Sequence, residues 1–504
     1  MILRFYTNKE SKGMIRIFQF LFTAICIMVL PAFAVANDRG IMSLKLKTLS
    51  ILTLQSVLKQ VEENHPLLKG SQTEKMVASG KLLEALGKFE PTIVNDWELE
   101  RLAKQSSNKT LGFNDTFVQM RHKSGVKGFA GFRAGIGDVS VTDLAIGSSN
   151  QPLMGIAIPL LRGLNTNPDH AKLKKSNLAE EQAKLEIQQT RQELYFGAAN
   201  QYWNWVAALK FMELENNAVA VAEERLIQLE KQRSAGSIPM FDVDEGKQEF
   251  QRRRDGLIKA KRKVDEEKLK LDLFLWEDDH LSSKKNYTAP LIPLPIKTYS
   301  ADDLEQGKKR AANERPELQM VKLKTELNQI DLKVTENNLL PDLTLEAEPT
   351  RKPGEFVLGL GYRFGVRLSF PFYQKKARGE FLQQTGKAQQ LKLLKKYKSK
   401  KVSLDVENAH NALKRAEERI RVSKEVLLLA KKLEKGERTR FKYGATSLLI
   451  VNLRERNVLK AEKEWITAMA DYQKAQALYR FSIGEWSQKV SSSNGTNKKE
   501  NFDL

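Results

Sequence analysis

In the stretch FVLGLGYRFGVRLSF, residues 356–370, every even position is apolar and the odd positions are mostly small or charged. The apolar residues are Phe356, Leu358, Leu360, Tyr362, Phe364, Val366, Leu368 and Phe370. Such a period of two predicts a strand with one apolar face and one wetted face. A transmembrane barrel strand needs roughly 9–11 residues of this kind, whereas a soluble strand usually has about half that number. The pattern favours a membrane strand, and a long amphipathic hairpin on a soluble core is the alternative.

This strand belongs to the second copy of a duplicated pattern. The spacing from Pro66 to Pro91 is the same as that from Pro316 to Pro341. Two further landmarks repeat in the same order: IAIPL at 156–160 with LSFPF at 368–372, and GSI at 236–238 with GAT at 444–446. A duplicated unit of this length predicts a pseudo-symmetric body, which suits a ring assembled from several chains.

The duplication sets the domain organisation that we expect. Residues 1–36 read as a signal peptide, because a basic segment and an apolar run precede Ala34-Val35-Ala36. The remaining boundaries are a first repeat at 37–288, a Pro-rich linker at 289–300, a second repeat at 301–486 and a disordered polar tail at 487–504. Within the repeats we expect β-hairpins at about 95–160 and 343–372, and long helix pairs at about 167–276 and 375–483. The first β region is longer than the second, which we interpret as a longer loop.

The long helices carry a seam of apolar and small residues that step by three and four. Its members are Val406, Ala409, Leu413, Ala416, Ile420, Ser423, Leu427 and Ala430. This heptad predicts coiled-coil packing. A helix of about 68 residues is roughly 100 Å long. An ordinary antiparallel coiled-coil hairpin without a channel is the alternative.

About four strands per chain are expected, and four cannot close a barrel. An open sheet edge in hydrocarbon leaves backbone groups without hydrogen bonds. The sequence therefore predicts one barrel shared by several chains.

Composition argues against an enzyme and against nucleic acid as a partner. The net charge is +21, charged residues make up 29% and mean hydropathy is −0.45, which suits long solvated helices. No nucleic-acid-binding motif accompanies the basic balance. The only cysteine is Cys26, and the five histidines (His65, His122, His170, His280 and His410) have no metal-ligand or triad spacing. We expect no catalysis, no metal and no cofactor.

The order of helices, hairpins and turns resembles the TolC-like outer membrane efflux protein family (outer membrane factors). The resemblance covers residues 54–486 and rests on Ile158-Pro159, on Phe370-Pro371 and on the segment that begins at Gly444-Ala445-Thr446-Ser447. It implies a mainly α fold with β: a coiled-coil α-barrel continued by a trimeric 12-stranded transmembrane β-barrel, with four strands per chain.

The resemblance also implies a function. The protein would be a homotrimeric exit duct of a tripartite efflux or type I secretion system, located in the cell outer membrane and extending into the periplasm. Its partners would be outer membrane lipid, a periplasmic adaptor (membrane fusion protein) and an inner-membrane pump. A soluble periplasmic coiled-coil scaffold or adaptor without channel activity is the alternative. The cargo stays open; the basic stretch 392–398 would favour anions if it faced the lumen.

Site residues follow from the resemblance by position. The turns at Gly236-Ser237 and Gly444-Ala445 would contact the adaptor, although they also read as helix caps. The carboxylates Asp242, Asp244 and Glu245 would line the periplasmic entrance, or would simply favour the helix dipole. Asn452 stands where acidic residues are common in the family, and Arg454 and Arg456 would form gate contacts or a solvated face. The expected membrane-facing residues are Phe356, Leu358, Leu360, Tyr362, Phe364 and Val366.

Overall fold

The computed structural model describes residues 50–104, 107–136, 151–276, 287–288, 290–292, 299–349 and 362–488. These residues belong to one compact unit, Ser50–Leu504. The expected signal peptide, most of the expected linker, the tail beyond residue 488 and the positions Phe356, Leu358 and Leu360 lie outside the described residues.

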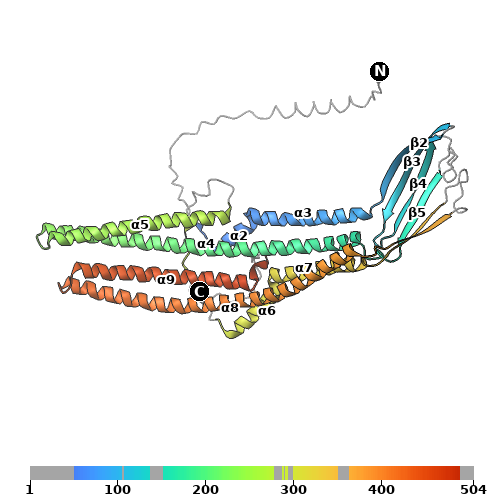
Figure 1. Cartoon of the computed structure of the whole chain (residues 1–504). Coiled ribbons are helices and arrows are strands. Elements are labelled where there is room, and N and C mark those ends of the chain that lie inside the picture. The colour runs from blue at the N-terminus through green and yellow to red at the C-terminus, as the bar shows by residue number, and fades with distance from the viewer. Residues whose placement is uncertain are drawn as a thin grey trace, which may run out of the picture. The chain divides into compact units, whose positions relative to one another are not determined.

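Two long helical hairpins make up most of this unit (Figure 1). The first consists of α4 (Pro168–Ser234) and α5 (Met240–Leu275), and the second of α8 (Lys375–Lys442) and α9 (Leu448–Ser482). The predicted seam of α8 is confirmed: every seam residue is buried or half-buried, and Val406, Ala409 and Leu413 are completely inaccessible. Burial of this stripe against neighbouring helices stabilises the hairpin.

Shorter helices repeat in each half. The first half has α2 (Leu54–Asn64), α3 (Pro66–Leu86) and the 3-10 turn η1 (Gly87–Phe89); the second has α6 (Ala301–Glu314), α7 (Pro316–Asn337) and, at its end, η3 (Glu485–Ser487). Capping boxes at Thr53 and Ser300 begin α2 and α6, and a proline occupies the first position of α3 and of α7. Two short strands, β1 (Ser50–Ile51) and β6 (Tyr287–Thr288), pair in parallel.

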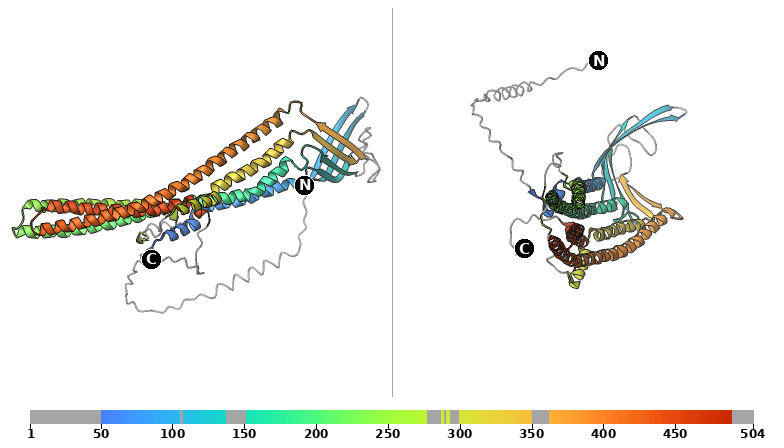
Figure 2. Two further views of the ribbon diagram at one scale, coloured as in Figure 1. Left: turned by 90° about the horizontal axis from the view of Figure 1, so that it is seen from below. Right: turned by 90° about the vertical axis from the view of Figure 1, so that its left-hand side faces the viewer.

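At one end of the helices lies an antiparallel sheet (Figures 1 and 2). Its strands are β2 (Thr92–Lys104), β3 (Ser107–Arg121), β4 (Lys127–Ile136), β5 (Gln151–Pro159), β7 (Asp342–Pro349) and β8 (Tyr362–Ser369), paired in that order. The expectation of four strands is therefore wrong, because the described residues already form six strands of one sheet.

The error lies in the first β region, where a hairpin and a longer loop were expected. The insertion instead forms the hairpin β3–β4, which lies between β2 and β5. The alternation is weak in β3 because Asn114 and Thr116 share a face with Val118, whereas Phe113 and Phe117 lie on the other face. A strand of this kind is hard to distinguish from a loop by periodicity alone.

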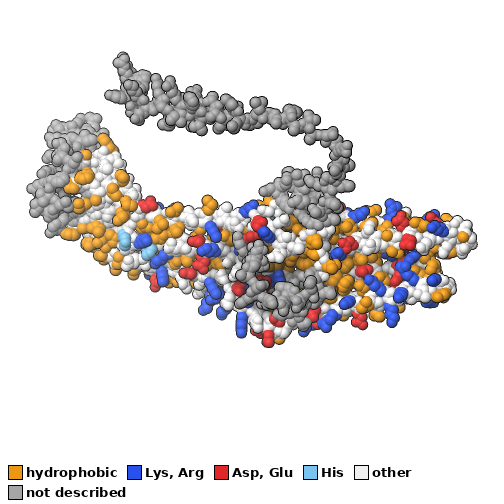
Figure 3. Space-filling model, turned by 180° about the vertical axis from the view of Figure 1, so that it is seen from behind, with side chains coloured by type: hydrophobic (Ala, Val, Ile, Leu, Met, Phe, Trp, Pro, Cys, Tyr) orange, Lys and Arg blue, Asp and Glu red, His pale blue; other side chains and the backbone are white. Residues whose placement is uncertain are grey.

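The register gives the sheet two different faces. Residues paired directly across antiparallel strands lie on the same face. One face carries exposed apolar side chains on five of the strands: Ile93, Trp97, Val118, Met120, Phe132, Met154, Ile156, Phe364, Val366 and Leu368. The opposite face carries Arg121, Lys127, Glu346 and Arg367. Hydrophobic side chains gather over the described part of the sheet, whereas charged ones are spread along the helices (Figure 3).

Of the described residues, no helix is both long enough and apolar enough to cross a membrane.

Candidate functional site at the helix tips

Both helical hairpins end in the same kind of turn, at the end of the molecule away from the sheet (Figure 1). Gly236 and Gly444 have φ angles of +75° and +72°, in the left-handed region that favours glycine. The Gly236 N–H donates to the Arg233 carbonyl at 2.9 Å, and the Gly444 N–H donates to the Phe441 carbonyl at 2.9 Å. Both glycines, with Ser237 and Ala445, are exposed. The turns therefore cap α4 and α8 and leave a free surface at the tips.

A small apolar cluster lies behind the turns and joins the two hairpins. Leu229 of α4, Val243 of α5 and Leu448 of α9 are buried together. Leu226 and Ile238 pack against them. The tips are thus held together by packing as well as by charge.

An ionic cluster, consisting of Arg225, Arg438, Asn452, Glu455 and Glu245, links all four long helices. Arg225 of α4 donates from both terminal nitrogens to Glu455 of α9, with one N–O distance of 2.6 Å. Arg438 of α8 approaches the same carboxylate at 2.7 Å. Asn452 of α9 accepts from Arg225 at 3.1 Å and donates to Glu245 of α5 at 3.2 Å.

The central ion pair of this cluster is largely buried. The side chains of Arg225 and Glu455 are only 18% and 13% exposed. Burial lowers the pKa of Arg225, but the hydrogen bond and the charge of Glu455 outweigh it and raise the pKa above its ordinary value. Arg225 therefore keeps its positive charge, and salt screens the buried ion pair less than it screens a surface pair.

The structure brings some of the predicted entrance residues into this cluster and leaves others outside. Glu245 and Asn452 bond to each other. Asp242 is half-buried and Asp244 exposed, and neither has a side-chain partner in the described part of the chain. Asp242 lies in the first turn of α5, where a carboxylate favours the helix dipole.

The two arginines predicted as gate contacts, Arg454 and Arg456, make longer contacts than Arg225 does, and neither contact joins the two hairpins. The Nε atom of Arg454 lies 3.9 Å from the buried carboxylate of Glu437, an ion pair between α9 and α8 of the same hairpin. Arg456 donates to the Asn452 carbonyl of its own helix at 3.3 Å.

The sequence reasoning missed Arg225, Arg438 and Glu455. Each is one of many charged residues on helices that carry charge on most turns, and no spacing marks them. Only the packing of α9 beside both α4 and α8 identifies their partners.

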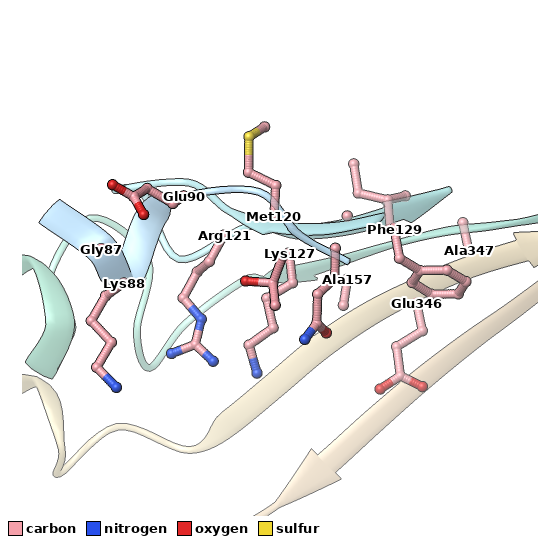
Figure 4. Close-up of a pocket in the computed structure, with 14 residues that line it drawn as sticks. Gly87, Lys88, Glu90, Met120, Arg121, Lys127, Phe129, Ala157, Glu346 and Ala347 are labelled. Carbon is pink, nitrogen blue, oxygen red and sulfur yellow. The ribbon is translucent and has the colours of Figure 1, made fainter. Parts of the chain in front are cut away.

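A second candidate site is a hollow of about 510 Å³ where the helices meet the sheet. Lys88, Arg121, Lys127 and Glu346 point toward the same side of the sheet, whereas Met120 points to the other (Figure 4).

The hollow has an excess of positive charge. Arg121 forms an ion pair with Asp169, and Glu346 forms one with Arg367. Lys88 and Lys127 have no ion-pair partner in the described residues.

The basic stretch 392–398 lies on α8, with Lys392, Lys395 and Lys396 exposed.

Comparisons with known proteins agree with this architecture. Residues 308–485 match the family model described as outer membrane efflux protein. The solved outer-membrane channel OprN has the same fold, with a TM-score of 0.65 and 13% identity over 86% of this chain and 91% of that one. The Campylobacter jejuni CmeC outer membrane channel matches with 0.64 and 12%, over 92% and 99% of the two chains. The Neisseria gonorrhoeae MtrE outer membrane channel matches with 0.60 and 13%, over 90% and 98%.

No curated protein matches the sequence. The described fold is that of outer membrane channels. The second half of the chain is similar to the outer membrane efflux protein family, and the resemblance found in the sequence is confirmed.

Proposed function

We propose that the protein is a homotrimeric duct of the outer membrane, the exit of a tripartite efflux or type I secretion system. The observation that carries this proposal is the exposed apolar face of the sheet at one end of two long helical hairpins. The apolar face would contact lipid, and the opposite face, which carries Arg121, Lys127 and Arg367, would contact water.

The duct would be closed by several copies. The sheet has two free edges, β2 and β8, and hydrocarbon does not tolerate unpaired backbone groups. The helical hairpins would continue the duct through the periplasm, and their tips would meet an adaptor that also contacts an inner-membrane pump. No nucleic acid takes part in this scheme.

The ionic cluster is proposed as the lock of the closed tip. Arg225 and Glu455 join the first hairpin to the second within one chain. Opening the tip requires the two hairpins to move apart, so the bonds of this pair would break. An adaptor that binds the exposed turns at Gly236 and Gly444 could supply the energy for this separation.

One experiment tests the duct against the soluble scaffold. The protein is expressed in a Gram-negative host, membranes are separated, and the purified protein is added to a planar bilayer. We expect it in the outer membrane fraction, resistant to extraction without detergent, and conducting ions in the bilayer. A monomer that stays in solution without detergent would support the scaffold and overturn the duct.

A second experiment tests the proposed entrance. Asp242→Asn with Asp244→Asn should lower the preference for cations, because a ring of carboxylates in a narrow mouth selects them. The measurement is the reversal potential in a salt gradient across the bilayer. Asp255→Asn, farther along α5, is the matched control. An unchanged selectivity of the double variant would reject the entrance ring.

A further inference from the structure

We propose that all six strands of each chain form the wall of the shared barrel, so that three copies close a barrel of eighteen strands instead of twelve. This inference rests on the proposed function, because it assumes that three copies share one barrel. It changes the width of the duct and hence the size of the cargo.

The place of the inserted hairpin in the sheet is the first support. In the second half, β7 follows α7 and pairs directly with β8, which precedes α8. In the first half, β2 and β5 occupy the corresponding positions in the chain but do not pair. The hairpin β3–β4 separates them, with ladders on both sides: Ile93 opposite Val118, and Phe129 opposite Gly155. It cannot leave the wall unless β2 and β5 form a new ladder.

The anchorage of the hairpin turn is the second support. The turn between β3 and β4 lies against the connection that leads from β5 into α4. The Asn167 side chain donates to the Lys123 carbonyl at 3.0 Å, and the Asn165 N–H donates to the Ser124 carbonyl at 2.9 Å. Arg121 at the end of β3 pairs with Asp169 of α4. These contacts fix the inserted strands to the base of the sheet.

The side chains of the inserted strands are the third support. Val118, Met120 and Phe132 are exposed on the same apolar face as Val366 of β8. Phe117 and Phe129 lie on the other face, with ring centroids 5.7 Å apart. The insertion therefore continues the two faces of the sheet, as a membrane wall requires.

The two edges suit each other as partners in neighbouring copies. An even number of antiparallel strands places β2 and β8 in opposite directions, so that β8 of one copy can pair antiparallel with β2 of the next. On the polar face, β2 presents the exposed Asp96 and β8 the exposed Arg367. These charges are complementary across such a junction.

The consequence is a wider passage. Barrel diameter grows roughly linearly with strand number, so eighteen strands give a cross-section about twice that of twelve. Barrels of about 16–18 strands leave an aqueous channel. The cargo that fits such a barrel is bulky and hydrated rather than small and apolar.

Cysteine pairs test the strand order in the assembled protein, since Cys26 is the only cysteine of the chain. Ile93→Cys with Val118→Cys should form an intramolecular disulfide in outer membranes, because these residues are direct partners. Ile93→Cys with Ile158→Cys should not, because two strands separate β2 from β5. A disulfide in the second pair and none in the first would overturn the eighteen-strand barrel but leave the shared duct intact.

The junction between copies is tested separately. Ile93→Cys is combined in turn with Phe364→Cys, Val366→Cys and Leu368→Cys, because all lie on the apolar face. Dimers and trimers linked by disulfides are expected for at least one pair. Their absence in every pair, together with a soluble monomer, would reject the duct itself and with it the wide barrel.

Labelling and polymer exclusion complete the test. In outer membrane vesicles, Phe132→Cys should react with a lipid-soluble maleimide, whereas Gln119→Cys on the other face should react with a charged one. Poly(ethylene glycol) added at the sheet end should enter the barrel and reduce the conductance up to the molecular size that fits eighteen strands. A cut-off at the size that fits twelve strands, or labelling of Phe132→Cys by the charged reagent alone, contradicts the proposal.

Discussion

Arg225 lies near the helix tips in a largely buried ion pair with Glu455. Its guanidinium binds Glu455 with two hydrogen bonds and also donates to Asn452. The carboxylates that the sequence suggested for the entrance, Asp242 and Asp244, have no such contacts in the described residues. At the residue scale, connections between hairpins are therefore made by an arginine that no spacing rule identifies.

Removing Arg225 leaves the buried Glu455 with Arg438 as its remaining cation. We expect Arg225→Ala to lower the free energy of unfolding by about 1–3 kcal/mol, since a buried carboxylate loses two hydrogen bonds. Urea unfolding of the detergent-purified protein measures this. Arg233→Ala is the control, because Arg233 is exposed in the last turn of the same helix. Equal stability of the two variants would contradict a structural role for the cluster.

His65 gives the helical body a dependence on pH. It is 5% exposed at the junction of α2 and α3, near the rings of Phe274 and Trp276, and burial lowers its pKa from 6.5. His65 binds a proton more readily in the unfolded chain than in the folded one. The contribution of neutral His65 to the free energy of unfolding is therefore fully present above pH 6.5 and falls as the pH drops below that value. His65→Gln should weaken this pH dependence. Thermal unfolding at several pH values between about 5 and 8, the range in which histidine changes its charge, measures the effect. A parallel loss in both proteins would assign the dependence to other groups.

At the scale of elements, periodicity predicts long helices well and inserted strands poorly. The seam of α8 repeats over eight positions, and the helix begins at Lys375, where the sequence predicts the start of the second helix pair. In β3 the faces are mixed, because a cross-strand network of Asn95, Asn114 and Thr116 lies on the face that elsewhere is apolar. The strand is stable because it is paired on both sides, which the alternation of a single segment does not reveal.

The tip turns offer an element-scale test. Gly444→Ala should destabilise the second hairpin by about 1 kcal/mol, because the left-handed backbone is strained with a side chain. Space is not the reason, since a Cβ there meets nothing within 4 Å. Gly436→Ala, in the exposed interior of α8, also meets nothing and should stabilise by about 0.5–1 kcal/mol. Thermal unfolding measures both, and effects of the same sign would contradict the turn geometry.

At the scale of the whole molecule, the alternation in residues 356–370 predicted a two-faced sheet, and Phe364, Val366 and Leu368 do share an exposed apolar face. The number of strands was not predictable, because it depends on pairing between distant segments such as β5 and β7. The tip residues Gly236 and Gly444 were readable from the turn chemistry. Their ionic neighbours were not, because charge pairing between helices is set by tertiary packing.

A charge on the apolar face tests the membrane role of the entire sheet. Val366→Arg should cost up to about 2–4 kcal/mol if the residue lies near the bilayer midplane, and less near its surface. We expect less assembled protein in the outer membrane, measured by heat-modifiable bands in gel electrophoresis. Ser369→Arg adds the same charge to the same strand on the polar face, opposite Asp342, and should be tolerated. Equal amounts of both variants would argue against lipid contact.

The length of α8 has a mechanical consequence. A rod of about 68 residues acts as a lever roughly 100 Å long, so a rotation of about 3° at the sheet end displaces the far tip by roughly 5 Å. Glu455 of α9 belongs to the same hairpin as α8, and a displacement of this size exceeds the reach of its hydrogen bond from Arg225 of α4. A tilt small enough to leave the packing near the sheet undisturbed is therefore sufficient to separate the partners at the other end.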